Sequence, residues 1–131
     1  MKNSDVRAAL DLTEEWNALD NGSILTMGCV VVRREFAEEN PEAVAAFVEE
    51  YRESIEAVAG DPEAASTLVE KYEITGSAAI AKAAIPDCNL ICITGADIQA
   101  GIEGYYKVLL DADPTSIGGE LPGDDFYYTA E

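Results

Sequence analysis

The chain has 131 residues, of which 48% are hydrophobic, and its formal net charge is −18 at pH 7. Such a charge repels polyanions, so nucleic acids and anionic membranes are excluded as main partners. Three cysteines and no histidine argue against a disulfide framework and against a triad of the usual Ser–His type. We therefore expect small buried cysteines, no metal, no cofactor and no catalytic residue.

The first 32 residues are expected to contain two strands and one short helix. Apolar residues alternate over residues 5–12, which predicts a half-buried strand, with a short helix as the alternative. Thr13 is expected to cap a short helix that contains Trp16. A turn is predicted at residues 20–23. The near-continuous apolar run over residues 24–32 then predicts a strand that is buried on both faces.

The middle of the chain carries strong helix signals. Asn40 is a favourable N-cap and Pro41 a favourable first helical residue, which together predict the start of a long helix. Apolar side chains recur there at steps of three and four residues, and Gly60 is expected to end the helix. Asp61 and Pro62 repeat the same start signal and predict a second helix.

The last 55 or so residues (77 onward) alternate between helical and irregular segments. Ser77 is expected to cap a short helix over residues 78–84, and residues 90–93 are expected to form a strand or an extended packing segment. A helix starting at Thr94 or Asp97 is predicted to run to about residue 110, and the aromatic residues 126–128 are expected to pack against another part of the protein.

Several motifs occur in an order that resembles the solute-binding proteins of ABC importers, closest to the nitrate/sulfonate/taurine and thiamine-precursor type. The motifs, which together cover nearly the whole chain, are Val30-Val31-Val32-Arg33-Arg34-Glu35-Phe36, Asn40-Pro41-Glu42-Ala43-Val44, Asp61-Pro62-Glu63-Ala64-Ala65, Ile85-Pro86-Asp87-Cys88-Asn89, Ser116-Ile117-Gly118-Gly119 and Phe126-Tyr127-Tyr128.

This resemblance implies an α/β fold of the type II periplasmic-binding-protein kind, here a helix-rich lobe fragment with a small mixed sheet. Residues 1–131 would be one C-terminal lobe segment, with residues 1–29 near the hinge and in the second lobe and residues 30–131 in the first lobe. The chain would then be a truncated part of an extracytoplasmic protein, periplasmic or a cell-surface lipoprotein, although it carries no export signal itself.

The resemblance also implies a function and a site. The whole protein would bind a small nitrogen- or sulfur-containing solute by hinge closure and present it to an ABC permease. The implied ligand-binding residues are Trp16, Ser23, Thr26 and Met27, each of which also suits ordinary packing or turn structure. An exposed sheet edge would favour a homodimer.

Two alternatives remain open from the sequence. Arg33 and Arg34 form the only adjacent basic pair, which suits either an anionic ligand or ion pairs with the neighbouring glutamates. The alternative function is an acidic, non-catalytic structural or interaction domain that self-associates.

Overall fold

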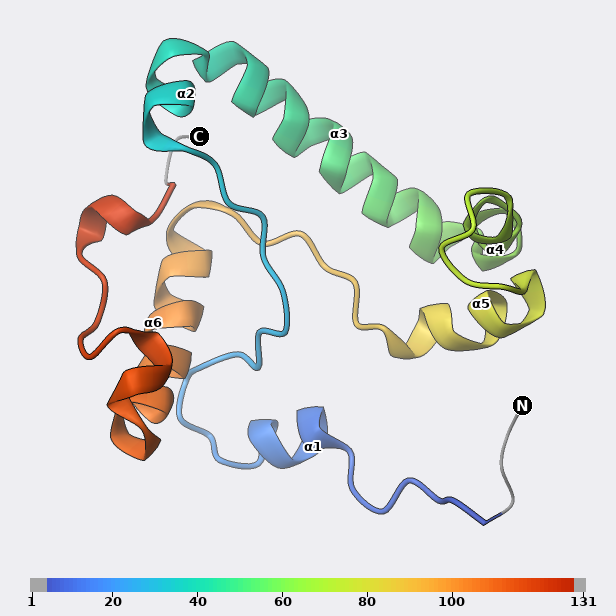
Figure 1. Cartoon of the computed structure of the whole chain (residues 1–131), viewed down its shortest axis with the longest axis horizontal. Coiled ribbons are helices and arrows are strands. Elements are labelled where there is room, and N and C mark those ends of the chain that lie inside the picture. The colour runs from blue at the N-terminus through green and yellow to red at the C-terminus, as the bar shows by residue number, and fades with distance from the viewer. Residues whose placement is uncertain (1–4, 129–131) are drawn as a thin grey trace. The chain divides into compact units, whose positions relative to one another are not determined.

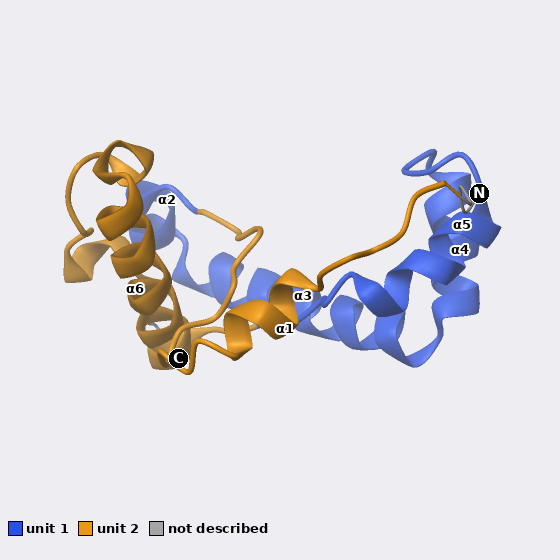
Figure 2. Cartoon of the chain, turned by 90° about the horizontal axis from the view of Figure 1, so that it is seen from below, with its two compact units in different colours: residues 1, 32–92 blue, residues 2–31, 93–131 orange. Residues whose placement is uncertain are grey.

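The computed structural model describes residues 5–128, which form two compact units (Figures 1 and 2). Residues 32–92 make up the first unit. Residues 5–31 and 93–128 make up the second unit, so the chain leaves the second unit once and returns to it. The predicted division between residues 1–29 and 30–131 stays a prediction.

The first unit is made of helices. They are α2 (Arg34–Glu39), α3 (Pro41–Gly60), α4 (Pro62–Lys71), α5 (Ala78–Ala84) and the short 3-10 helix η1 (Ile85–Asp87). The helix α4 packs against α5, and α3 contacts α2, α4 and η1.

Small side chains are buried in α4 and α5. Ala65, Ser66 and Ala81 are all buried, and the Ser66 hydroxyl donates a hydrogen bond of 2.8 Å to the Glu63 carbonyl. Small residues let two helix backbones approach closely, and the hydroxyl is satisfied within its own helix. A salt bridge from Lys82 to Glu63 links the outer surfaces of the two helices.

The long helix α3 begins and ends where the sequence predicts, but its first cap works differently. Pro41 is its first residue and Gly60 its last. Asn40 makes no side-chain capping bond to α3; its amide Nδ2 instead donates to the Phe36 carbonyl at 3.1 Å and closes the end of α2. Asp61 does cap α4 as predicted, because its Oδ1 accepts from the Ala64 amide at 3.0 Å.

The second unit contains α1 (Leu12–Asn17), α6 (Gly95–Ala112) and the 3-10 helices η2 (Pro114–Ile117) and η3 (Asp124–Phe126). Helix α6 contacts η2, which follows it directly. Asp11, rather than the predicted Thr13, caps α1: its Oδ1 accepts from the amides of Thr13 and Glu14. The C-terminal aromatic segment does pack as predicted through Tyr127, which is buried.

The predicted fold class, an α/β lobe with a small mixed sheet, is wrong, because residues 5–128 contain no strand. Residues 24–32 and 90–93 are extended chain without ladder partners, and Val31 is 80% exposed. Residues 5–11 are also irregular, and Val6 is 71% exposed. β-Branched residues favour strands only where a second strand supplies the backbone partners and packing, and these segments have none within the described part of the chain.

The cysteines also differ from the prediction. All three are free, but Cys29 and Cys88 are exposed and Cys92 is half-buried. The expectation of buried cysteines is therefore wrong. No helix among residues 5–128 combines the length and the apolar character needed to cross a membrane.

Candidate functional site

The site begins with two glycines of α6 that allow a close backbone approach. A Cβ atom built on Gly104 would lie 2.6 Å from the Ser23 Cβ and 3.1 Å from its Cα, and one built on Gly101 would lie 2.9 Å from the Ile24 Cγ1. At Gly104 only glycine leaves room, because the neighbouring atoms are the Cβ and the backbone of Ser23, whereas the neighbour of Gly101 is a flexible side chain. The two glycines therefore let the segment after the turn at residues 20–23 pack directly on α6, in spite of their low helix propensity.

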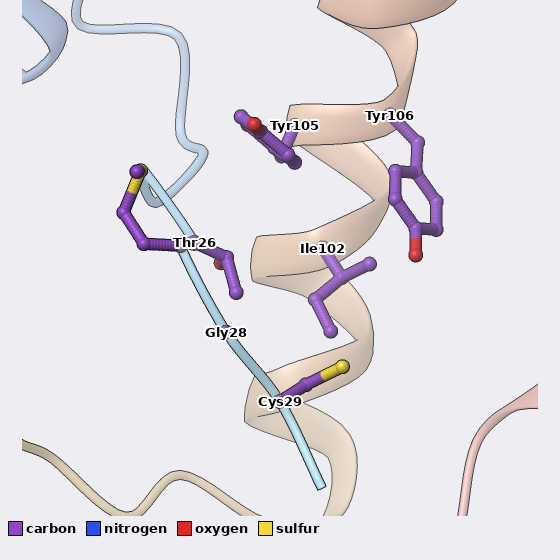
Figure 3. Close-up of a pocket in the computed structure, with 7 residues that line it drawn as sticks. Thr26, Gly28, Cys29, Ile102, Tyr105 and Tyr106 are labelled. Carbon is purple, nitrogen blue, oxygen red and sulfur yellow. The ribbon is translucent and has the colours of Figure 1, made fainter. Parts of the chain in front are cut away.

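A cavity lies where this extended segment runs along α6, within the second unit (Figure 3). Its volume is about 150 Å³. The lining residues come from two stretches of the chain: Thr26, Met27, Gly28 and Cys29 from the extended segment, and Ile102, Tyr105 and Tyr106 from α6. An apolar cavity of about this volume takes a molecule the size of benzene.

One polar atom in this cavity has no partner. The Oγ1 atom of Thr26 is buried and makes no hydrogen bond within the described residues. A buried hydroxyl without a partner costs about 1–3 kcal/mol, so such atoms are rare unless a ligand or water satisfies them. The Thr26 side chain lines the cavity, and its hydroxyl is left without a partner there among the described residues.

Trp16 and Ser23 support the cavity wall instead of lining it. The Trp16 indole Nε1 donates to the Ser23 Oγ at 2.9 Å, and Ser23 in turn donates to the Asn21 Oδ1 at 2.6 Å. The Trp16 ring packs on Tyr105, with ring centroids 5.3 Å apart. This arrangement fixes the orientation of Tyr105, whose ring lines the cavity.

Five aromatic rings of the second unit contact one another in series. After Trp16 and Tyr105, the ring of Tyr106 lies 6.3 Å from Tyr105 and 6.3 Å from Phe126, and Phe126 meets Tyr127 edge-on at 5.3 Å. These separations are typical of favourable aromatic pairs. The series connects the α1 end of the unit with its C-terminal segment along α6.

Two of these tyrosines have raised pKa values. Burial raises the pKa of Tyr106, and the nearby Cys29 and Tyr105 add to the effect. Burial also raises the pKa of Tyr127, with smaller contributions from Glu103, Tyr106 and Asp124. In both cases the environment disfavours the phenolate. Both hydroxyls therefore carry their protons at neutral pH and serve as neutral groups.

Tyr127→Phe is expected to stabilise the protein by about 1 kcal/mol at neutral pH, because the buried Tyr127 hydroxyl has no hydrogen-bond partner within the described residues. Because the pKa of Tyr127 is raised in the folded protein, ionisation of this side chain also makes the wild-type stability depend on pH. Its contribution to the wild-type free energy of unfolding should be constant below about pH 10 and should fall as the pH rises through the raised pKa, and Tyr127→Phe should lack this contribution. Urea unfolding at pH 7 and at several pH values above 10, followed by circular dichroism, measures both effects.

The control for this prediction is Tyr72→Phe, which changes a tyrosine that is 67% exposed. It should leave the free energy of unfolding at pH 7 unchanged. A loss of stability in Tyr127→Phe at pH 7 would show that the Tyr127 hydroxyl has a partner and would contradict the prediction.

The structure brings the four predicted ligand-binding residues into one region but gives them different places. Thr26 and Met27 line the cavity, whereas Trp16 packs on Tyr105 and Ser23 accepts a hydrogen bond from Trp16. Whether any of them binds a ligand stays a prediction. Arg33 and Arg34 do not line this cavity.

Sequence reasoning did not select the five other lining residues as site residues; they are Gly28, Cys29, Ile102, Tyr105 and Tyr106. A signal was present in the pair Gly101 and Gly104, three residues apart on one face of α6. Small residues at this spacing indicate a close backbone neighbour, and the bulky residues beside them then border the contact. No group of His, Cys, Asp or Glu side chains within residues 5–128 is arranged to hold a metal ion.

Comparison with known proteins overturns the resemblance to ABC importers. The family model that matches this chain is described as menaquinone biosynthesis, and it matches residues 1–109. No curated protein and no solved structure matches the chain. The motifs that suggested a solute-binding protein are mainly helix starts, which many folds share.

The predictions that depended on that resemblance are corrected with it. Solute binding for transport, a permease partner and a lipoprotein of the nitrate/sulfonate/taurine type are wrong for a biosynthesis family. A homodimer through a sheet edge has no basis, since residues 5–128 form no sheet. The alternative, a self-associating interaction domain, fits the family no better. The extracytoplasmic location has lost its support and stays an untested prediction.

The family model covers well over half of the 131 residues, including α1 and the extended segment of the cavity and most of α6. On this evidence the chain belongs to the menaquinone biosynthesis family.

Proposed function

We propose that the second unit binds an aromatic, oxygen-bearing intermediate of menaquinone biosynthesis in the cavity between residues 26–29 and α6. The unpartnered, buried Thr26 hydroxyl is the observation that carries this proposal. A ring of the ligand would pack against Ile102 and Tyr105, and the Thr26 hydroxyl would bond an oxygen on that ring. The family match supports an intermediate of menaquinone biosynthesis as the ligand, and the volume and lining of the cavity support a single ring that carries an oxygen.

The part of this chain in the reaction is proposed to be binding and orientation, with no catalytic residue. The cavity is lined by no carboxylate and no amine, and the chain has no histidine. General acid–base catalysis at neutral pH favours groups whose pKa lies near 7. The raised pKa of Tyr106 moves that residue further from this range.

Thr26→Val tests the proposal because it removes the hydroxyl and keeps the shape of the side chain. Phenol and toluene are suitable probes, since they share one ring and differ in the oxygen. We expect the wild-type chain to bind phenol about fivefold more tightly than toluene, the equivalent of about 1 kcal/mol for one hydrogen bond. In Thr26→Val this preference should disappear, as measured by titration of ¹H–¹⁵N NMR shifts.

A second measurement separates a binding role from a packing role for Thr26. Removing an unsatisfied buried hydroxyl should raise the free energy of unfolding by about 1 kcal/mol while ligand preference is lost. Thr67→Val is the control, because the Thr67 hydroxyl donates to the Glu63 carbonyl at 3.2 Å in the first unit. Thr67→Val should keep the preference for phenol. Equal binding of phenol and toluene by the wild-type chain would overturn the proposal.

A further inference from the structure

A second cavity in the same unit is larger and is not used by the proposed function. It lies at the C-terminal end of α6, where η2, the following loop and η3 fold back beside the helix, and its volume is about 480 Å³. Most of its wall is apolar and comes from Tyr106, Leu109, Ile117, Leu121, Pro122 and Phe126. Cavities of this volume are in the range that holds small organic ligands.

Local hydrogen bonds fix the shape of this cavity. Asp113 caps η2, with its Oδ1 accepting from the Thr115 amide at 3.0 Å and from the Thr115 hydroxyl at 2.7 Å. These bonds hold the pKa of Asp113 below its usual value. Gly118 then ends η2 with a φ of 84°, a conformation that glycine adopts without strain. The loop is therefore formed by its own sequence and does not depend on a ligand for its turn.

The charges around this cavity select against anions. The charged residue that lines it is Glu120, and Asp124 lies in η3, next to the lining residue Gly123. Neither lysine nor arginine lines it. A carboxylate or phosphate placed there would meet like charge without a compensating cation, on a chain whose net charge is −18.

The aromatic side chains favour a ligand with a flat ring system. The rings of Tyr106 and Phe126 are 6.3 Å apart and tilted by 59°, and both line the cavity. Phe126 is 54% exposed, so its ring is accessible to a bound molecule. A flat apolar molecule in the cavity would cover both the exposed ring of Phe126 and the aliphatic side chains that line the cavity.

We propose that this second cavity is a binding site for a neutral molecule with a flat apolar ring system larger than one benzene ring. Tyr106 lines both cavities, so it forms the wall between this site and the smaller one. The two sites differ in the size of the group they take. A naphthalene-sized probe suits the cavity of about 480 Å³, and a single ring suits the one of about 150 Å³.

The test compares 2-naphthylmethanol with 2-naphthoate, which have the same ring system and differ in charge. Titration of the full chain, followed by ¹H–¹⁵N NMR shifts of residues 116–126, should give about tenfold tighter binding of the neutral probe, the equivalent of 1.4 kcal/mol. Glu120→Gln should improve binding of 2-naphthoate and leave that of 2-naphthylmethanol unchanged. Equal affinity for both probes in the wild-type chain would overturn the proposal.

Two variants locate the bound probe. Phe126→Ala removes an exposed ring, so the chain should still fold, and we expect at least about a fivefold loss of 2-naphthylmethanol affinity, consistent with one aromatic contact. Thr26→Val changes only the smaller cavity and should leave this affinity within about twofold. If Thr26→Val lowered the affinity for 2-naphthylmethanol and Phe126→Ala did not, the probe would lie in the smaller cavity and the proposal of a second site would be overturned. The phenol experiment tests the smaller cavity and the 2-naphthylmethanol experiment tests the larger one, so either can fail while the other succeeds.

Discussion

Gly104→Ala is expected to lower the free energy of unfolding by about 1–2 kcal/mol, although alanine is the better helix former. The higher propensity of alanine contributes about 1 kcal/mol in favour of the variant. The added Cβ, however, would lie 2.6 Å from the Ser23 Cβ and 3.1 Å from its Cα. Ser23 is held by bonds from its amide and its hydroxyl to the Asn21 Oδ1. Overpacking against a fixed neighbour costs about 1–3 kcal/mol. A separation of 2.6 Å places this site in the upper half of that range, so the cost exceeds the propensity gain by about 1–2 kcal/mol.

Urea unfolding followed by Trp16 fluorescence measures this effect, because Trp16 bonds directly to Ser23. Gly101→Ala is the matched control in the same helix. Its new Cβ would meet the ends of the Ile24 side chain, which can rotate away. Gly101→Ala should therefore cost less than Gly104→Ala or even stabilise the protein. The prediction is contradicted if Gly104→Ala is the more stable of the two.

Ile102→Ala is expected to lower the free energy of unfolding by about 2–3 kcal/mol. Ile102 is the buried large apolar side chain of α6, with 7% of its surface exposed. Truncation of such a residue to alanine typically costs about 2–5 kcal/mol, and the open cavity beside Ile102 places this site near the lower end. Thermal unfolding followed by near-ultraviolet circular dichroism measures the loss, since the aromatic series of the second unit gives that signal.

Ile98→Ala provides the comparison for this variant. Ile98 lies one turn earlier in α6 and is half-buried, so the change in helix propensity is the same and the change in burial is smaller. We expect it to cost less than half as much as Ile102→Ala. Equal costs would mean that the effect comes from the helix itself and that Ile102 does not anchor the unit.

The helices could be predicted because their signals lie within a few residues of sequence. Pro41 and Pro62 mark the starts of α3 and α4, and the predicted helix over residues 78–84 has the bounds of α5. The strand predictions failed because a strand depends on a distant partner. The run over residues 24–32 has strand composition, but no partner for it lies within the described residues.

The site was predictable only in part for a related reason. Thr26 and Met27 stand out in an apolar run, but the lining residue Tyr105 looks like any apolar position of an amphipathic helix. What makes Tyr105 a cavity residue is the approach of the extended segment at Gly104. That approach is a property of two segments about 80 residues apart, so helical periodicity alone does not reveal it.

The arrangement of the two units along the chain has a consequence for how the protein forms during synthesis. Residues 32–92 are contiguous, so the first unit has all its parts as soon as residue 92 is made. The second unit needs residues 93–128 as well as 5–31, so it cannot be complete before residue 128 is made. Bringing its two halves together across a flexible segment of about 60 residues would cost on the order of 4 kcal/mol in chain entropy. If the first unit has already folded, the flexible segment is shorter and this entropic cost is smaller. The order of synthesis therefore favours folding of the first unit first and formation of the α6 cavities as a late step.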